Sequence, residues 1–480
     1  MSDQSKREWS KKELRRIPQA AGLRRAAAFQ RSLIGITGAW IARLRHAECK
    51  YMAARHLWEW AEIFDGLRKR LLEMPGGKPD APLENHLNSV LEEALFAADE
   101  EPFLDALYNV LLPALRRAYL GYIQSTVELP DRPSVHLLKD AARTIEQQLQ
   151  EGRDMLQSFR RERDTAPDTA SDVSASGSDS SAEWVRHMQA LLDTAGGLSG
   201  KAETATVEAK RRYAGRTYRS PEMQHRTVGS HYSYEHPIEG YLWSNNLKGD
   251  PLIERAALAV WLYNELDAAE YLSPILYEVR GMPWEFYYDV ARHTWDEARH
   301  SEFGLKLMTA LGFTPGEFEV WVATYMSSIQ LKPYERYAAV TCWYEPGSFQ
   351  VKPDYLARLA EEAGGEDLAV ELLRFDLADE TLHVSFGHKW VEKLMRHYGD
   401  SRTVDEFVAE VKKLGTALRE EQAAAFTRTM PDANRHTLES IREHMERWME
   451  EKGKAIPVYA AQTSTEHGGA EDDWREGSSL

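Results

Sequence analysis

The sequence contains the stretch D-E-A-R-H-S-E-F-G at residues 296–304 and the related stretch D-E-T-L-H-V-S-F-G at residues 379–387. Both fit the frame D-E-x-x-H-x-x-F-G, and the second copy begins 83 residues after the first. That separation is about the length of one helical hairpin. The repeat therefore predicts that two long helices each place a glutamate and a histidine, three residues apart, on one face.

Helical periodicity surrounds both copies from residue 250 onward, and strand-like alternation is nearly absent. Proline and glycine residues divide this region into segments. We expect helices from Pro251 towards Arg280 with a kink at Pro274, from Pro283 to Leu311, from Thr314 to about Glu345, and over 353–362, 366–398, 403–428 and 432–452. The pattern predicts an all-α protein whose C-terminal region is a four-helix bundle with additional helices.

The whole chain divides by composition into four parts. Residues 1–161 are helical by pattern and are expected to form an N-terminal helical domain. Residues 162–250 are polar, small and Gly-rich, which predicts a largely irregular linker with a short helix near 183–194. The bundle would then occupy 251–454, and the acidic tail 455–480 is expected to be disordered.

Composition excludes several functional classes. The net charge of −17 argues against a nucleic-acid partner, and no apolar run is long enough to predict a membrane span. The N-terminus has no apolar stretch of the kind that directs secretion, so a cytoplasmic location is expected. The only two cysteines, Cys49 and Cys342, lie far apart in the sequence. Any bound metal would therefore need nitrogen and oxygen ligands.

The repeated frame carries groups that can bind such a metal. Glu297 and His300 share one helix face, as do Glu380 and His383. Apolar neighbours on both faces indicate that these side chains point inward. Burying a carboxylate and an imidazole is costly unless another charge compensates. Two such pairs that meet in a core favour a metal ion as the compensating charge.

A dinuclear carboxylate site needs one more glutamate from each of two other helices. Glu265 lies 32 residues before the first glutamate of the frame, and Glu345 lies 35 residues before the second. The similar spacings favour these two residues. Glu270 and Glu335 remain as alternatives.

Further polar residues accompany both copies. Asp296 and Asp379 precede the glutamates, where each could accept a hydrogen bond from the far nitrogen of a ligating histidine. Arg299 follows in the first copy only. His293 and Asp376 lie four residues before the glutamates, on the same face, and either support the site or are polar residues of the core.

The N-terminal half has a polar cluster of its own. Two interpretations are open, a degenerate second bundle with a lost site and, as the favoured one, a solvated helix face beside a plain bundle. The residues are His46, Glu48, His56, Glu59, Glu62 and Glu146.

The runs N-E-L-D-A-A-E-Y-L (264–272) and G-M-P-W-E-F-Y-Y-D-V-A-R-H-T-W-D-E-A-R-H (281–300), with Y-E-P-G-S-F-Q-V-K-P (344–353), resemble the ferritin-like di-iron carboxylate superfamily. More narrowly, they look like a family of bacterial ferritin-like proteins of unassigned function, which is similar to the tRNA-hydroxylating mono-oxygenase branch. The resemblance covers roughly residues 250–400. It implies a ferritin-like bundle with two iron ions, or manganese, held by Glu265, Glu297, His300, Glu345, Glu380 and His383.

The resulting functional expectation is an oxidoreductase or oxygenase that uses O2 or peroxide. Its substrate would be a small or carrier-bound molecule of unknown identity, and an electron donor would be a further partner. The alternative is a non-catalytic metal-binding scaffold or iron-handling protein. A zinc hydrolase is disfavoured, because the H-E-x-x-H motif is absent and too many carboxylates converge.

Overall fold

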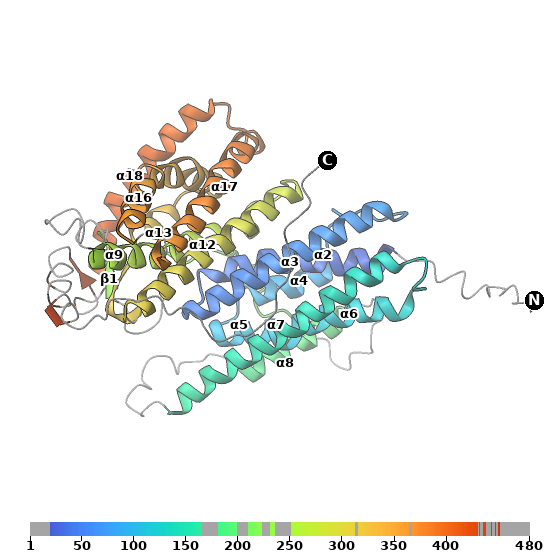
Figure 1. Ribbon diagram of the computed structural model, residues 1–480. Coiled ribbons are helices and arrows are strands. Elements are labelled where there is room, and N and C mark those ends of the chain that lie inside the picture. Colours follow the sequence, from blue (N-terminus) through green and yellow to red (C-terminus); the bar gives the residue numbers. More distant parts are fainter. Residues whose placement is uncertain are drawn as a thin grey trace, which may run out of the picture.

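The computed structural model describes residues 20–165, 181–198, 210–222, 231–235, 251–312, 315–363 and 367–430, together with a few residues between 432 and 451. Within these ranges the protein is built almost entirely of helices, which confirms the all-α prediction (Figure 1). The expected disordered tail, the final helix over 432–452 and most of the irregular linker lie largely or wholly outside the described residues.

The N-terminal half contains a four-helix arrangement. Helix α2 packs against α3 and α6, and α7 packs against both α3 and α6. Helix α8 confirms the short helix expected near 183–194. The elements are α2 (Ala20–Ile41), α3 (Ala47–Glu73), α4 (Asn85–Ala94), α5 (Glu100–Ala106), the π-helical turn η1 (Leu107–Leu111), α6 (Leu112–Ser125), α7 (Arg132–Thr165) and α8 (Ser181–Thr194).

The C-terminal half carries the repeated frame on its two longest central helices, α12 and α17. Helices α9 and α10 pack along α12, and the π-helical turn η5 packs along α17. The elements are α9 (Pro251–Asn264), α10 (Leu266–Leu272), α11 (Ile275–Glu278), α12 (Trp284–Ala310), α13 (Ala323–Ser328), α14 (Pro333–Ala339), η5 (Val340–Tyr344), α15 (Glu345–Ser348), α16 (Lys352–Ala363), α17 (Leu368–His397) and α18 (Val404–Thr429).

The prediction of one helix from Thr314 to about Glu345 is wrong. After a short turn (η4, Pro315–Glu317), the chain forms the strand β2 (Glu319–Trp321), and the long helical segment begins only at Pro333. Strand β2 pairs in parallel with β1 (His231–Ser233), which also pairs with β3 (Arg435–His436). Sequence periodicity missed this sheet because its strands are only two or three residues long and come from distant parts of the chain.

The first helix of this half is broken at Glu265, nine residues before the kink predicted at Pro274. The Asn264 side chain donates to the backbone oxygens of Val260 and Glu319, and it accepts from the backbone N–H of Trp321. These hydrogen bonds connect strand β2 to the break between α9 and α10. A polar side chain that bonds to nearby backbone offers the chain an alternative to helical pairing.

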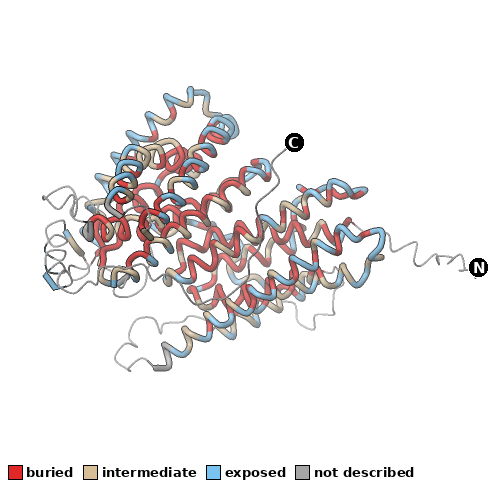
Figure 2. The backbone as a smooth tube through the Cα atoms, viewed as in Figure 1, coloured by how far each residue is buried: buried red, intermediate tan, exposed pale blue. Residues whose placement is uncertain are grey.

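One hydrophobic core runs through both halves, and it appears as the buried centre of the tube in Figure 2. Helix α3 packs along α12, and α2 packs against α11. A fully buried ion pair between Lys50 of α3 and Glu270 of α10 joins the halves. No helix in the described part of the chain combines the length and the apolar character that crossing a bilayer requires.

Candidate metal centre

Eight side chains with metal-ligand chemistry meet in the interior of the C-terminal half. They form two adjoining groups, in each of which four ligand atoms lie within 4.8 Å of one another. Cluster A consists of His293, Glu297, Glu345 and His383, and cluster B consists of Glu265, His300, Asp376 and Glu380. All six residues proposed as ligands from the sequence are therefore brought together. His293 and Asp376, whose role the sequence left open, lie among them.

The local structure explains why these side chains converge. On α12 and α17, residues at positions four before, at, and three after the frame glutamate project from one face. The remaining two glutamates lie at irregularities. Glu265 occupies the break between α9 and α10, and Glu345 directly follows the π-helical turn η5. Breaks and π-helical turns of this kind are frequent at functional sites, because they turn a side chain out of the regular helical register.

The aspartates of the frame are crossed between its two copies. Asp296 on α12 lies 3.3 Å from Nε2 of His383 on α17, and Asp379 on α17 lies 3.2 Å from Nε2 of His300 on α12. Each copy thus orients the histidine of the other. With Nε2 directed at a carboxylate, the Nδ1 atom of each ring faces the clusters. Such carboxylate contacts fix the ring orientation of metal-binding histidines.

Two arginines of α12 hold the crossed aspartates together. Arg299 donates to both Asp296 and Asp379, the latter at 2.7 Å. Arg292 donates to Asp296 at 2.8 Å and lies 3.6 Å from Asp379. Arg299 belongs to the first copy of the frame and Arg292 lies one helical turn before it, so one helix supplies the positive charge for both aspartates. The missing arginine of the second copy is therefore compensated across the helix pair.

The glycine that ends the frame allows the neighbouring helix to approach. A Cβ atom on Gly304 would lie 2.1 Å from the backbone nitrogen of Tyr263 in α9, and one on Gly387 would lie 2.8 Å from Thr341 in η5. The contacted residues precede the two candidate glutamates, Glu265 and Glu345, by only a few residues. The geometry shared by the two copies thus includes close packing against the segment that supplies the extra glutamate.

Several polar atoms of the clusters are buried without a hydrogen bond to any described residue. Burying polar atoms without well-formed hydrogen bonds is unfavourable, so the gathering of such atoms in one place indicates a position for a cation. The atoms that face the clusters are Nδ1 of His300 and His383, Oε2 of Glu265 and Glu380, and Oδ2 of Asp376.

The charges of the clusters shift the ionisation of their members. Burial alone would raise the pKa of Glu297, but contacts with His293, His300 and His383 hold it well below its usual range. Burial lowers the pKa of His383, but Asp296 and Glu297 outweigh it and raise the value to about 9. Burial also lowers the pKa of His300, but contacts with Asp379, Glu265 and Glu297 outweigh it and raise the value. Without a metal ion, the imidazoles of His300 and His383 thus keep protons that balance the carboxylates.

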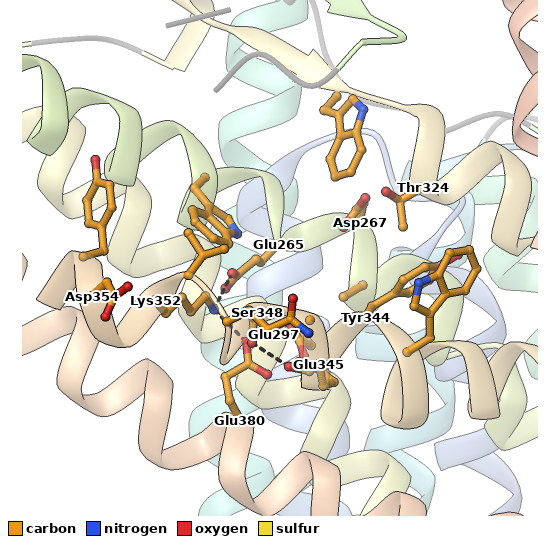
Figure 3. Close-up of a pocket in the computed structure, with 18 of the residues that line it drawn as sticks. Glu265, Asp267, Glu297, Thr324, Tyr344, Glu345, Ser348, Lys352, Asp354 and Glu380 are labelled. Atoms are coloured by element: carbon orange, nitrogen blue, oxygen red, sulfur yellow. Dashed lines mark hydrogen bonds and ion pairs between the residues drawn. The ribbon is translucent and has the colours of Figure 1, made fainter. Parts of the chain in front are cut away.

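Lys352 is a residue of the centre that the sequence did not reveal. It is the first residue of α16 and is almost fully buried. Its ammonium lies 2.9 Å from Glu265 Oε1, 2.8 Å from Asp376 Oδ1 and 2.7 Å from Glu380 Oε1, as Figure 3 shows for the two glutamates. Burial would lower the pKa of Lys352, but the carboxylates raise it. The run 344–353 contains this lysine, but a single lysine before a proline has no periodic partner that would mark it as part of the centre.

The alternative ligands suggested by the sequence lie elsewhere. Glu270 pairs with Lys50 at the junction between the halves. Glu335 accepts from the backbone N–H of Lys332 at the start of α14. Neither belongs to a cluster, so the geometry favours Glu265 and Glu345.

A cavity of about 560 Å³ borders the centre (Figure 3). Its wall includes Glu265, Glu297, Glu345 and Glu380 of the clusters, together with Lys352. The rest of the wall is rich in aromatic side chains: Trp261, Tyr271, Trp321, Trp343, Tyr344 and Tyr355. The cavity is large enough for a small organic molecule.

The polar cluster of the N-terminal half is not a single solvated face. His56 is fully buried and lies 2.9 Å from both the Tyr108 hydroxyl and Glu151. His46 contacts Glu100 and forms a potential three-residue metal group with it and Cys49. Glu146 pairs with Arg116 on the surface. The favoured sequence interpretation is therefore wrong for His56, which is a hydrogen-bonded core residue.

Comparison with known proteins gives one match. Residues 252–437 match a protein family described as "Protein of unknown function (DUF455)". The matched segment includes every residue of clusters A and B and Lys352. The searches of curated proteins and of solved structures returned no match.

Proposed function

We propose that clusters A and B hold a dinuclear metal centre, with iron as the expected metal, and that the protein is an oxidoreductase or oxygenase acting with O2 or peroxide. The observation that carries the proposal is the convergence of five carboxylates and three imidazoles in the core, where several buried polar atoms form no well-defined hydrogen bond. Nitrogen and oxygen ligands of this kind suit iron and manganese. Bound iron would supply the electrons and the open coordination positions that O2 chemistry requires.

The chain's own residues would prepare the site for such chemistry. The crossed aspartates and the two arginines fix the rings of His300 and His383 before any ion binds. The aromatic wall of the adjoining cavity would exclude water and hold an apolar part of the substrate beside the carboxylates. A centre used only to hold a metal would not need a cavity that opens onto its ligands.

Metal analysis combined with oxygen uptake tests the proposal. Full-length protein is loaded anaerobically with Fe²⁺, freed of excess ion and mixed with O2-containing buffer. We expect up to two irons per chain and O2 uptake in proportion to bound iron. Glu345→Gln should lose metal and uptake, and Glu335→Gln, which lies outside both clusters, should retain both.

Other outcomes would change the conclusion. Bound iron without O2 uptake would favour the metal-scaffold or iron-handling alternative. Failure to bind any metal, or loss of metal in Glu335→Gln but not in Glu345→Gln, would contradict the proposed centre.

A further inference from the structure

The two clusters differ in what they already contain. Cluster A has two carboxylates and two imidazoles, and among the described residues the ion-pair partners of Glu297 and Glu345 are all histidines. Cluster B has three carboxylates and one imidazole, and the ammonium of Lys352 contacts all three carboxylates. Cluster B would be the more negative of the two without this lysine. With it, the formal charge of each cluster is the same, −2 with neutral imidazoles.

The position of the ammonium is that of a bound cation. Three carboxylate oxygens from α17 and from the α9–α10 break surround it at 2.7–2.9 Å, and the lysine side chain is 1% exposed. These oxygens belong to the same residues that offer ligand atoms in cluster B. A buried ammonium with three charge-assisted hydrogen bonds is strongly held.

We propose that Lys352 is a resident cation of cluster B with which a second metal ion must compete, so that metal ions enter cluster A first and cluster B second. This inference rests on the proposed dinuclear centre. Whether the ammonium leaves or stays, it opposes the second ion, because it either occupies ligand oxygens or repels a divalent charge at short range.

The structure also places the ammonium at the edge of an open space. Lys352 lines the cavity beside the centre, and in its present position its Nζ atom already lies 5.4 Å from the centre of the Trp261 ring on the cavity wall. The face of an aromatic ring attracts an ammonium group. Because Lys352 begins α16, its side chain can swing towards the cavity without disturbing a helix interior.

Titration with Mn²⁺ tests the order of loading without complication from oxidation. Metal-free, full-length protein is titrated, and free Mn²⁺ is counted by electron paramagnetic resonance. We expect wild type to bind one ion tightly and a second at least about tenfold more weakly. Lys352→Met should strengthen the second binding step by about tenfold or more, and the first step should not weaken.

Matched variants separate a local effect from a general one. Lys352→Arg keeps a cation and should retain the wild-type order. Lys389→Met removes a lysine from the outer side of α17, where it pairs with Asp289, and should change neither step. Thermal unfolding of each metal-free variant checks the fold, and Lys352→Gln serves if the methionine variant does not fold.

The possible failures are distinct. A second step that is unchanged or weaker in Lys352→Met, or two equal steps in wild type, would overturn the role of Lys352 and leave the dinuclear centre intact. If neither wild type nor Lys352→Met binds Mn²⁺, the proposed centre fails and this inference falls with it.

Discussion

At the scale of single residues, the crossed aspartates are the part of the site that most directly connects the two copies of the repeated frame. Asp296 serves the histidine of α17, and Asp379 serves the histidine of α12. Neither copy can therefore orient its own imidazole. This gives a physical reason for the duplication, because each half of the centre depends on a group supplied by the other.

The crossing predicts where an aspartate substitution acts. Asp296→Asn should weaken metal binding in cluster A through His383, and Asp379→Asn should weaken it in cluster B through His300. Loss of a carboxylate that orients a metal-binding histidine costs about 10- to 100-fold in metal affinity. Competition with a chelator of known affinity measures the metal affinity of each cluster in each variant.

The control for this prediction is Asp354→Asn, because Asp354 lines the cavity but contacts neither histidine. The crossed arrangement would be contradicted if Asp354→Asn lowered the metal affinity as much as the other two substitutions. It would also be contradicted if Asp296→Asn lowered the affinity of cluster B alone.

The residues that sequence reasoning found are those whose spacing repeats. Glu297, His300, Glu380 and His383 were marked by the frame itself, and Glu265 and Glu345 by their similar distances from it. Lys352 could not be found in this way, because its role depends on how α16 begins beside α17. That placement is a tertiary property, and no local pattern encodes it.

At the scale of helices and strands, the glycines of the frame set the distance between α12 and α9 and between α17 and η5. Gly304→Ala should destabilise the protein by about 1–3 kcal/mol, because the new methyl group meets the backbone of α9 rather than a movable side chain. Urea unfolding measures the change in free energy.

Gly121→Ala in α6 is the matched control, since an added Cβ there meets nothing within 4 Å. It should be neutral or stabilising by about 0.5–1 kcal/mol, as expected for alanine in a helix. Equal unfolding free energies for both variants would contradict close packing at Gly304.

Helix α8 is held to α4 by one carboxylate whose ionisation makes the contact sensitive to acid. Glu93 is buried and accepts from His187 of α8 and from the backbone N–H of Arg212. Burial would raise the pKa of Glu93, but these contacts lower it below its usual value. The stability from this contact is therefore present above pH of about 4.5 and is lost as the pH falls through the lowered pKa.

Hydrogen exchange of residues 181–194, corrected for intrinsic rates, tests whether the Glu93 carboxylate holds α8 in place. We expect Glu93→Gln at pH 7 to expose α8 to faster exchange, and we expect the same of wild type in acid. Glu92→Gln weakens a 3.4 Å contact with Arg211 and can still accept from Asn88, so it should have little effect. Unchanged protection of α8 in Glu93→Gln would show that the carboxylate does not hold the helix.

The element boundaries show the limit of sequence reasoning at this scale. The segment Pro283 to Leu311 was predicted within one residue of α12, because Gly281 and Gly312 mark both ends with positive φ angles. The break at Glu265 was not predicted, because it depends on Asn264 binding the backbone of β2. A distant strand cannot be inferred from the helix that it interrupts.

At the scale of the whole molecule, the two halves share a core, and the Lys50–Glu270 pair lies at their junction. Lys50→Met should destabilise the protein by about 3–5 kcal/mol, because it leaves Glu270 charged and buried. The double variant Lys50→Met with Glu270→Leu should recover much of that loss. Calorimetric unfolding of wild type, the single variant and the double variant measures the change in stability.

If Lys50→Met changed the free energy of unfolding only slightly, the proposed role of the buried ion pair in stability would be contradicted. A double variant less stable than the single variant would contradict it as well. Destabilisation of the C-terminal half by this N-terminal substitution would also show that the halves unfold together. Composition predicted a division of the chain near residue 161, but it could not predict which helices of the two parts share a core.

Anomalous X-ray diffraction from crystals soaked in Mn²⁺ tests the central claim most directly, since it locates bound ions without assuming their ligands. At low Mn²⁺ we expect one peak within about 2–2.5 Å of ligand atoms of cluster A, and at high Mn²⁺ a second in cluster B. Soaked crystals with no peak near either cluster, or with peaks only on the surface, would contradict a dinuclear centre in this protein.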